Sequence, residues 1–492
     1  MNAKVLYSSV TILVSGLLTS LASPATTISI NNVNAPGVGF NDPTPVTPLP
    51  SNPGTTLGAQ RLYVFQKAAD QWAILLNSNV PIIVQAQMSA LTCTQTSGTL
   101  GQAGPVSAAS NFPNAPKPNT VYNIAEANAL AGSDQDPGHD DINAQFNASI
   151  NGDPNCLGGA SWWYGTDPAA SPPPNSIPLL PVVFHELGHG LGFTSLIDSS
   201  SGSFLTSNPP VWAHYLYDTG ASLLWINMTD AERQASALND PKLVWTGART
   251  NKQAAAYLEP GNALIINAPV ALAGPHQVGT AAFGPVVPGV GIAEDLTLVN
   301  DGVAGVPTPP DPAGTVNDGC ETPFANSVSG KIALIDRGFC NFTQKVKNAQ
   351  NAGAIAVIIA NNKVEDLRLP RDMAGSDPTI TISSYSVTQK LGNEIKSQLP
   401  GVNATLGYAN IGINQDCARM FAPDPVLPGS SVSHFHADAS PNLLMEPALN
   451  TTNFDRVDLT LPLFADIGWS TNAEDFLFLD GFDPNPCPFV QP

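Results

Sequence analysis

Apolar residues near the N-terminal end of the chain recur with the spacing of an amphipathic helix. The residues of this stripe are Leu62, Phe65, Ala69, Trp72 and Leu76. Intervals of three and four residues place them on one face of a helix, which we expect to pack against a core. Apolar runs at 82–88 and 142–150 predict two strands, and a compact apolar run at 177–183 predicts the start of a second helix.

A different pattern begins in the second half of the chain. The run 331–335 predicts a buried strand, the segment 342–352 an amphipathic helix, and the run 354–360 another buried strand. Residues 386–389 read Ser-Val-Thr-Gln, a capping box that predicts the start of a further helix. Strands and helices that alternate at this spacing indicate a small α/β module with its own core, which we place at 256–410.

The composition of the chain excludes some classes of binding partner. The chain has 492 residues, and its 39 acidic and 19 basic side chains give a formal net charge of -20. This balance leaves no basic surface for nucleic acid or for an anionic membrane. With 43% hydrophobic and 12% charged residues, the chain can bury a sizeable core, and its length predicts more than one domain.

The first 22 residues have the pattern of a secretory signal peptide. Lys4 provides a positive start, residues 5–18 form an apolar run, and small residues around Leu21 offer a cleavage site after Ala22. The apolar run is shorter than the roughly 20 residues that span a bilayer, and no later stretch of the sequence is long enough. We therefore expect a secreted, extracellular protein without a membrane span in its mature form.

The six cysteines are expected to form disulfides, because the set is even and the chain is predicted to be exported. None of them lies in a Cys-x-x-Cys pair, which argues against a cysteine-ligated zinc site. Many connectivities are possible for such a set. Proximity along the sequence favours the pairs Cys320–Cys340, Cys93–Cys156 and Cys417–Cys487.

The segment 185–193 reads His-Glu-Leu-Gly-His-Gly-Leu-Gly-Phe and carries the clearest chemistry. On a helix, His185 and His189 lie one turn apart on the same face, so both imidazoles can reach one metal ion. Glu186 is turned by about 100°, which suits a group that contacts water at the metal without ligating it. Three glycines in this segment disfavour a continuing helix and predict a sharp turn after His189.

The pattern His-Glu-x-x-His-x-x-Gly resembles the zinc-binding helix of metzincin peptidases. Most metzincins place a third His three residues after the glycine, where this chain has Ser195. Leishmanolysin-like metzincins instead carry that His far downstream, in a Ser-x-Ser-His-aromatic block before a Leu-Met turn. Residues 431–435 match that block, and Met445 follows His434 at the family spacing.

This resemblance implies His434 as the third zinc ligand and Met445 as the turn methionine beneath the metal. His436 lies two residues further on, so in an extended segment its side chain points the same way and it remains an alternative ligand. The spacing to Met445 and the preceding Ser431 and Ser433 favour His434.

The long segment between the glycine and the third histidine contains a second resemblance. Residues 330–340 and 345–350 resemble a protease-associated (PA) domain, over about 262–408. PA domains are non-catalytic accessories, which the resemblance implies here as well. The two resemblances together imply an α+β fold, in which a metzincin-like catalytic domain, with an active-site helix and a small mixed sheet, is interrupted by an α/β PA domain. The expected boundaries are a signal peptide at 1–22, a peptidase domain at 23–255 and 411–470, the PA domain at 256–410, and a tail at 471–492.

The metzincin resemblance implies a secreted zinc endopeptidase that acts on proteins or peptides. One catalytic Zn²⁺ would activate water, with Glu186 as general base, and the strand at 142–150 would be the edge that pairs with extended substrate. A gluzincin-type peptidase with another third ligand is the enzyme alternative, and the next Glu along the chain is Glu232. The non-enzyme alternative is a catalytically inactive binding protein that keeps a structural zinc site and the PA domain.

Overall fold

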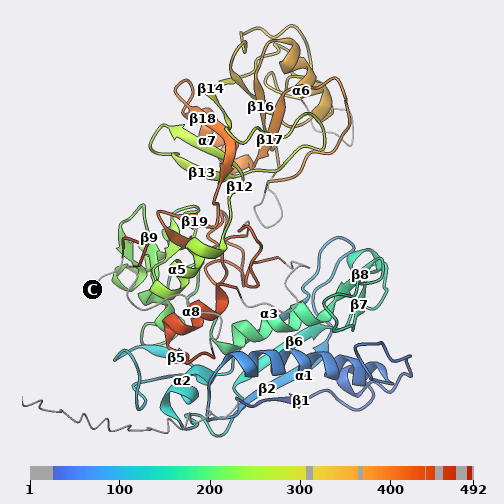
Figure 1. Cartoon of the computed structure of the whole chain (residues 1–492), viewed down its shortest axis with the longest axis vertical. Coiled ribbons are helices and arrows are strands. Elements are labelled where there is room, and N and C mark those ends of the chain that lie inside the picture. Colours follow the sequence, from blue (N-terminus) through green and yellow to red (C-terminus); the bar gives the residue numbers. More distant parts are fainter. Residues whose placement is uncertain are drawn as a thin grey trace, which may run out of the picture.

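The computed structural model describes residues 26–305, 314–363, 370–437, 439–448, 458–472 and 485–489. The predicted signal peptide and most of the predicted tail lie outside these residues. Figure 1 shows two parts, one above the other. We call Gly261–Ala409, the segment from the first to the last residue of the upper sheet, the insert, and the described residues on either side of it the body.

The N-terminal half of the body is built on a four-stranded sheet. Its strands, in spatial order, are β1 (Ile28–Asn32), β2 (Ile82–Ser89), β6 (Ile142–Asn147) and β3 (Gly101–Pro105). The first three run parallel, and β3 is antiparallel to β6. Two helices, α1 (Leu57–Leu75) and α3 (Leu179–Leu191), pack together beside this sheet (Figure 1).

The predicted helical stripe lies in the core of the body. Phe65, Ala69, Trp72 and Leu76 are fully buried, and Trp72 joins the two helices because its indole N–H donates to the carbonyl of Phe184 at 2.9 Å. The strand β2 alternates buried and partly exposed residues, as one covered sheet face requires. The apolar pattern therefore located both elements.

The strand predicted at 142–150 forms, but its expected place at the sheet edge is wrong. β6 pairs with β2 on one side and with β3 on the other, so it is an inner strand. Its Ile142, Ala144 and Phe146 side chains are fully buried, which suits an interior position. The edge is β3, whose Gly-Gln-Ala-Gly-Pro sequence has no apolar alternation and whose glycines and proline are typical of edge strands.

The rest of the body is completed by segments that flank the insert. Two short pairs are β4 (Ala108–Ser110) with β5 (Val121–Asn123) and β7 (Ser161–Trp163) with β8 (Ser176–Pro178). A five-stranded sheet has the order β10 (Leu223–Leu224), β9 (Leu216–Asp218), β11 (Leu243–Trp245), β20 (Cys417–Arg419) and β19 (Ile413–Asn414). The other α-helices of the described body are α2 (Ile124–Ala131), α4 (Asp230–Ser236), α5 (Ala248–Tyr257) and α8 (Thr460–Ile467). Because β20 pairs with β11, chain from both sides of the insert shares one sheet.

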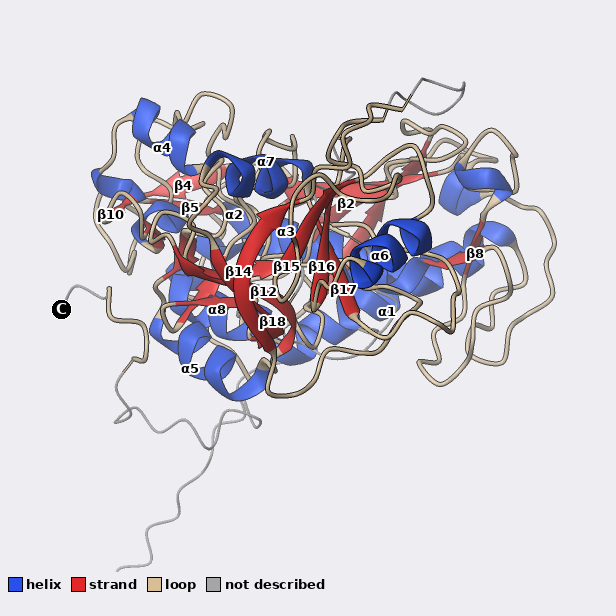
Figure 2. Cartoon of the chain, turned by 90° about the horizontal axis from the view of Figure 1, so that it is seen from above, coloured by secondary structure: helices blue, strands red, loops and turns tan. Residues whose placement is uncertain are grey.

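The insert folds around its own seven-stranded sheet. The spatial order is β13 (Gly274–Gln277), β12 (Gly261–Ala268), β18 (Asn403–Ala409), β14 (Ile292–Leu298), β15 (Ile332–Asp336), β16 (Ala356–Ala360) and β17 (Ser383–Val387). The helices α6 (Phe342–Asn351) and α7 (Gln389–Ser397) belong to this domain (Figure 2). Separate apolar clusters contain Val346 of α6 and Ile395 of α7, so the sheet has a core on each face.

The predicted strand–helix–strand unit of the insert corresponds to β15, α6 and β16. The predicted capping box at 386–389 is displaced. Ser386 belongs to β17, and the helix α7 is capped by Thr388, whose side chain accepts from the backbone N–H of Leu391. The capping residue was therefore assigned two positions too early.

The disulfides and the lengths of the helices are relevant to the predicted extracellular location. The structure contains the disulfides Cys93–Cys156, Cys320–Cys340 and Cys417–Cys487, the three pairs that sequence proximity favours. Among the described residues, no helix is both long enough and apolar enough to cross a bilayer.

Candidate metal centre

The helix α3 places its two histidines at the end of a buried apolar segment. Residues from Leu179 to Phe184 are buried, so the helix is fixed by packing before it reaches His185. It ends at Gly192, whose φ of 132° is strained for any residue with a side chain. The sharp turn predicted from the glycine pattern lies here, directly after the second histidine.

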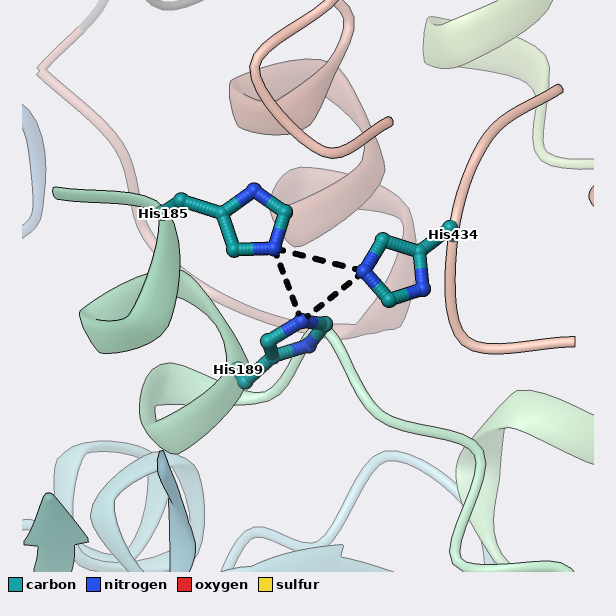
Figure 3. Close-up of side chains that lie close together, drawn as sticks. All are labelled: His185, His189 and His434. Carbon is teal, nitrogen blue, oxygen red and sulfur yellow. Dashed lines mark hydrogen bonds between the residues drawn. The ribbon is translucent and has the colours of Figure 1, made fainter. Parts of the chain in front are cut away.

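Three histidine side chains converge on one point although they come from distant parts of the chain. The Nε2 atom of His189 lies 3.1 Å from that of His185 and 3.1 Å from that of His434. The third side of the triangle, between His434 and His185, is 3.3 Å. Figure 3 shows the three rings facing one another, two from α3 and one from the segment after the insert.

Each of these rings is oriented by a backbone carbonyl at its other nitrogen. The Nδ1 atoms of His185, His189 and His434 lie 2.7, 2.6 and 2.8 Å from the carbonyls of Leu444, Phe193 and Ser430. A carbonyl can only accept, so each Nδ1 carries the proton and donates. The three Nε2 atoms therefore turn unprotonated lone pairs toward each other.

The electrostatic surroundings keep the three rings neutral. Burial lowers the pKa of His185 to about 4. Burial, and then the neighbouring His185, lower the pKa of His189 to about 3. Burial lowers the pKa of His434 well below its ordinary value, and the other two histidines add to the effect. Neutral imidazole is the form that ligates metals.

A zinc ion fits this arrangement. Three lone pairs at hydrogen-bond distance with no proton among them repel one another, and a cation at their centre removes that repulsion. Tetrahedral zinc with Zn–N bonds of about 2.0–2.1 Å requires its nitrogen ligands to lie about 3.3 Å apart, close to the observed spacing. Three histidine ligands also leave the fourth tetrahedral position of a zinc ion without a protein ligand.

Glu186 lies between α3 and the edge strand β3. A Cβ at Gly101 would come within 3.1 Å of its Cγ, and its carboxylate accepts from the backbone N–H of Ala103. Burial raises the pKa of Glu186 to about 8 against this opposing hydrogen bond. The sequence identified the glutamate but missed β3, because its glycine-rich sequence carries no strand signal.

Ser195 occupies the position of the missing third histidine and contacts the segment that supplies the replacement. Its backbone N–H donates to the Oγ atom of Ser433 at 3.2 Å, and the hydroxyl groups of the two serines lie 3.1 Å apart. Ser433 directly precedes His434. The loop after α3 therefore helps to position the third histidine, a role that sequence reasoning missed.

His436 points to a different part of the molecule. Its side chain is buried and its Nε2 lies 3.5 Å from Oδ2 of Asp240. The backbone of residues 434–436 pairs with that of residues 419–421. The Phe421 N–H donates to the His434 carbonyl, and the His436 N–H donates to the Arg419 carbonyl. Of the two histidines considered for the third position, His434 is the one that faces His185 and His189.

Met445 and Leu444 pack against the helix α3 beside the three histidines. Met445 is fully buried, and a Cβ at Gly188 would lie only 2.8 Å from its Sδ atom, which explains the glycine within the motif. The carbonyl of Leu444 holds His185, while the Leu444 N–H donates to the buried carboxylate of Asp458. Asp458 thus supports the first histidine through one residue, and no sequence motif had marked it.

The remaining titratable clusters have structural explanations. His139 lies on an exposed loop beside Asp136, and His214 packs with its Nε2 3.1 Å from the Thr120 hydroxyl. In the insert, one oxygen from each of Asp301, Asp318 and Glu321 lies within 4.8 Å of the others. The buried Lys345 ammonium lies 4.0 Å from Asp318 Oδ1, so this acidic group has an internal cation.

Comparison with models of known protein families identifies one domain of this chain. The sequence model of the PA domain family matches residues 295–395. The insert contains a PA domain. This match covers the β14–α7 region and agrees with the resemblance seen in the sequence.

Curated relatives share only short stretches with this chain. Signal peptide peptidase-like 2 of Arabidopsis thaliana is 35% identical over 82 residues, which are 17% of this chain and 15% of the relative. An aminopeptidase of Pseudomonas aeruginosa is 54% identical over 55 residues, 11% of this chain and 10% of the relative. Vacuolar-sorting receptor 2 of A. thaliana is 29% identical over 165 residues, 32% and 25% of the two chains. The chain thus spans a quarter or less of the length of these proteins.

Solved structures give likenesses of similar extent. An aminopeptidase from an Aneurinibacillus strain has a TM-score of 0.23 at 23% identity, over 32% of this chain and 37% of that one. A zinc aminopeptidase from Bacillus subtilis has a TM-score of 0.22 at 20% identity, over 33% and 35%.

Proposed function

We propose that this protein is a secreted zinc-dependent endopeptidase of the leishmanolysin-like metzincin type, with His185, His189 and His434 as ligands of one Zn²⁺ and Glu186 as general base. The observation that carries the proposal is the convergence of three unprotonated Nε2 atoms at 3.1–3.3 Å. The metzincin fold is supported by a mixed sheet with an antiparallel edge strand beside α3 and by Met445 under the histidines.

When bound, zinc supplies a Lewis acid that makes water acidic near neutral pH and polarises a carbonyl. The residues of this chain then handle the proton and the substrate. A bound cation would lower the pKa of Glu186 from the value that burial alone gives it, so that a Glu186 oxygen takes the proton from the attacking water and later returns it to the departing amine nitrogen. The Ala103 N–H holds that carboxylate in place against β3.

The strand β3 is proposed to bind the substrate. As the terminal strand of its sheet, it offers backbone groups on its outer side to an extended peptide. Since β3 runs beside α3, such a peptide lies next to Glu186. A strand open along its length accepts chain on both sides of the cleaved bond, which favours internal cleavage.

The two alternatives have less support in the structure. A gluzincin would need a third ligand such as Glu232, but that side chain caps α4 by accepting from the backbone N–H of Thr229 and is exposed. A purely structural zinc site closes its coordination with four protein ligands, whereas three histidines meet here. Disulfides accumulate in oxidising compartments, and the three found here support secretion.

The test is the substitution Glu186→Gln in the full chain. The amide is nearly isosteric but cannot accept the proton, so we expect casein hydrolysis to fall by at least about a hundredfold while zinc content stays at that of the parent. The exposed Glu259→Gln is the matched control and should hydrolyse casein normally. Equal activity of the Glu186→Gln and Glu259→Gln variants would remove Glu186 from the mechanism.

A further inference from the structure

A cleft separates the PA domain from the body on the side of β13 and β19. Its volume is about 610 Å³, within the range of about 300–1,000 Å³ that is typical of ligand sites. Residues 270–277 of the insert line one side, and residues 239–242 and 413–415 of the body line the other. Figure 1 shows β12 and β13 of the insert directly above β19.

Both walls of this cleft are edges of β-sheets. β13 is the terminal strand of the seven-stranded sheet, and all four of its residues line the cleft. β19 is the terminal strand of the five-stranded sheet, and its two residues line the cleft as well. A terminal strand carries backbone N–H and C=O groups on its outer side, which an extended polypeptide can pair with. Two such edges on one cleft are complementary to a peptide backbone.

The hairpin between β12 and β13 adds an apolar surface to this wall. Val270 is 91% exposed, and Ala271 and Ala273 are exposed beside it. These three residues give the mouth of the cleft apolar side chains that a bound chain could cover. Apolar side chains of a bound chain would fit here, while its backbone pairs with the strand edges.

Four of the charged side chains that line the cleft form two ion pairs, while Lys242 and Glu394 add one further charge of each sign. Arg419 donates to Oδ1 of Asp240 at 2.7 Å, and His436 contacts the other oxygen of the same carboxylate. Across the cleft, Lys390 of the PA domain pairs with Asp424 of the body at 3.3 Å. The ion pairs are compensated within the protein and the two further charges have opposite signs, so the lining has no excess of one charge for a small ionic ligand, and we expect recognition by backbone pairing and apolar contact.

The cleft floor belongs to the chain segment that carries the third histidine. Arg419, Phe421 and His436 line the cleft, and the 419–421 backbone pairs with the backbone of His434 and His436. A polypeptide held in the cleft therefore lies on the segment next to the metal centre. This continuity connects the cleft with the proteolytic site.

We propose that the cleft is a second binding site for the extended, unfolded part of a protein substrate, which pairs with the edges of β13 and β19 and covers Val270. The proposal rests on the proposed peptidase function, because it assigns the bound chain to the substrate. Short peptides that fill only the metal centre do not reach this site. The PA domain then selects long, unfolded substrates.

The experiment measures binding without cleavage. The full chain carrying Glu186→Gln is titrated into fluorescein-labelled β-casein, an unfolded protein, and fluorescence anisotropy gives the Kd. Adding Val270→Asp should raise this Kd by roughly tenfold, because a carboxylate would have to lose its hydration in the cleft. Adding Ala271→Arg should have a comparable effect by occupying the cleft with a long side chain.

The matched control is Val290→Asp. Val290 is a 95% exposed valine on a PA-domain loop that does not line the cleft, so this variant should bind β-casein with the parent Kd. Zinc content and thermal unfolding verify that each variant is folded. A Kd that is unchanged in both cleft variants, or raised equally by Val290→Asp, would overturn the proposal.

The same variants separate this proposal from the peptidase proposal. In the chain with Glu186 intact, Val270→Asp should raise the KM for β-casein with little change in kcat. If the protein binds β-casein through the cleft but cleaves nothing, the peptidase assignment fails while the cleft site stands. If it cleaves β-casein with a KM that is insensitive to the cleft variants, the peptidase stands and the cleft site fails.

Discussion

The body and the insert differ in how far apart along the sequence their defining contacts lie. In the insert, β15, α6 and β16 follow one another directly, and the two strands pair in parallel around the helix between them. In the body, the candidate metal centre brings together His189 and His434, which lie 245 positions apart in the sequence. An independent domain can therefore lie between two halves of a site in the sequence without separating them in space.

The geometry of the junction explains why the insertion leaves the body intact. Gly261 and Ala409, the first and last residues of the insert, are cross-strand partners in the β12–β18 pair. Antiparallel partners lie about 4.5–5.5 Å apart, so the insert enters and leaves the body at nearly one point. Among the described residues, the core cluster of the body contains none from the insert.

The largest effect is expected from His434→Ala. Two imidazoles hold Zn²⁺ poorly, so this variant should lose zinc affinity by orders of magnitude, although the residue lies beyond the insert. His436→Ala is the matched control. It removes a buried histidine from the same segment but one that pairs with Asp240, and it should retain zinc. Zinc stoichiometry after dialysis distinguishes them, and loss of metal only from the His436 variant would overturn the ligand assignment.

A smaller effect, on stability alone, is expected from Glu126→Gln in the body. Glu126 is fully buried, and neither carboxylate oxygen has a hydrogen-bond partner among the described residues. Burial raises the pKa of Glu126 well above its ordinary value. The folded protein thus keeps a proton that the unfolded chain loses, and stability falls as the pH rises above that ordinary value.

Gln is neutral at every pH and has nearly the same shape, so Glu126→Gln removes this part of the pH dependence. The unfolding temperature of the variant should exceed that of the parent more at pH 8 than at pH 5. Comparing the two proteins at each pH cancels the contribution of other buried acids such as Asp458. An identical difference at both values would show that Glu126 does not titrate as the burial implies.

The smallest effect on the metal is expected from removing the PA domain. When residues 262–408 are replaced by a short Gly-Ser linker, the adjacency of Gly261 and Ala409 allows closure without strain. The shortened chain should bind zinc as the parent does and cleave short peptides. A folded deletion variant that lacks zinc would show that the insert supplies a ligand, and that the metal site does not belong to the body alone.

Features encoded by residues close together in sequence were predictable. The His-Glu-x-x-His segment identified a helix, two converging histidines and a glutamate, because helical periodicity fixes their relative directions. The helical stripe of α1 was predictable for the same reason, and two of the seven strands of the insert, β15 and β16, were predictable from their short apolar runs. The third histidine needed a family resemblance, since nothing local to His434 indicates that its ring meets α3.

What escaped prediction depends on contacts that only the folded chain makes. The edge strand β3 carries no apolar alternation, so its position beside Glu186 appears only when the sheet is formed. Asp458 supports His185 through the backbone of Leu444, and Ser195 supports His434 through Ser433. Such supporting contacts leave no pattern in the sequence, because any residue of suitable shape and polarity could serve.

The central claim is tested most directly by titrating zinc into the metal-free full chain while casein hydrolysis is followed. The account predicts no hydrolysis without metal, and activity that rises with added Zn²⁺ and reaches its plateau at one ion per chain. Hydrolysis by the metal-free protein, or zinc uptake at one ion per chain with no hydrolysis of casein or of peptides, would contradict it.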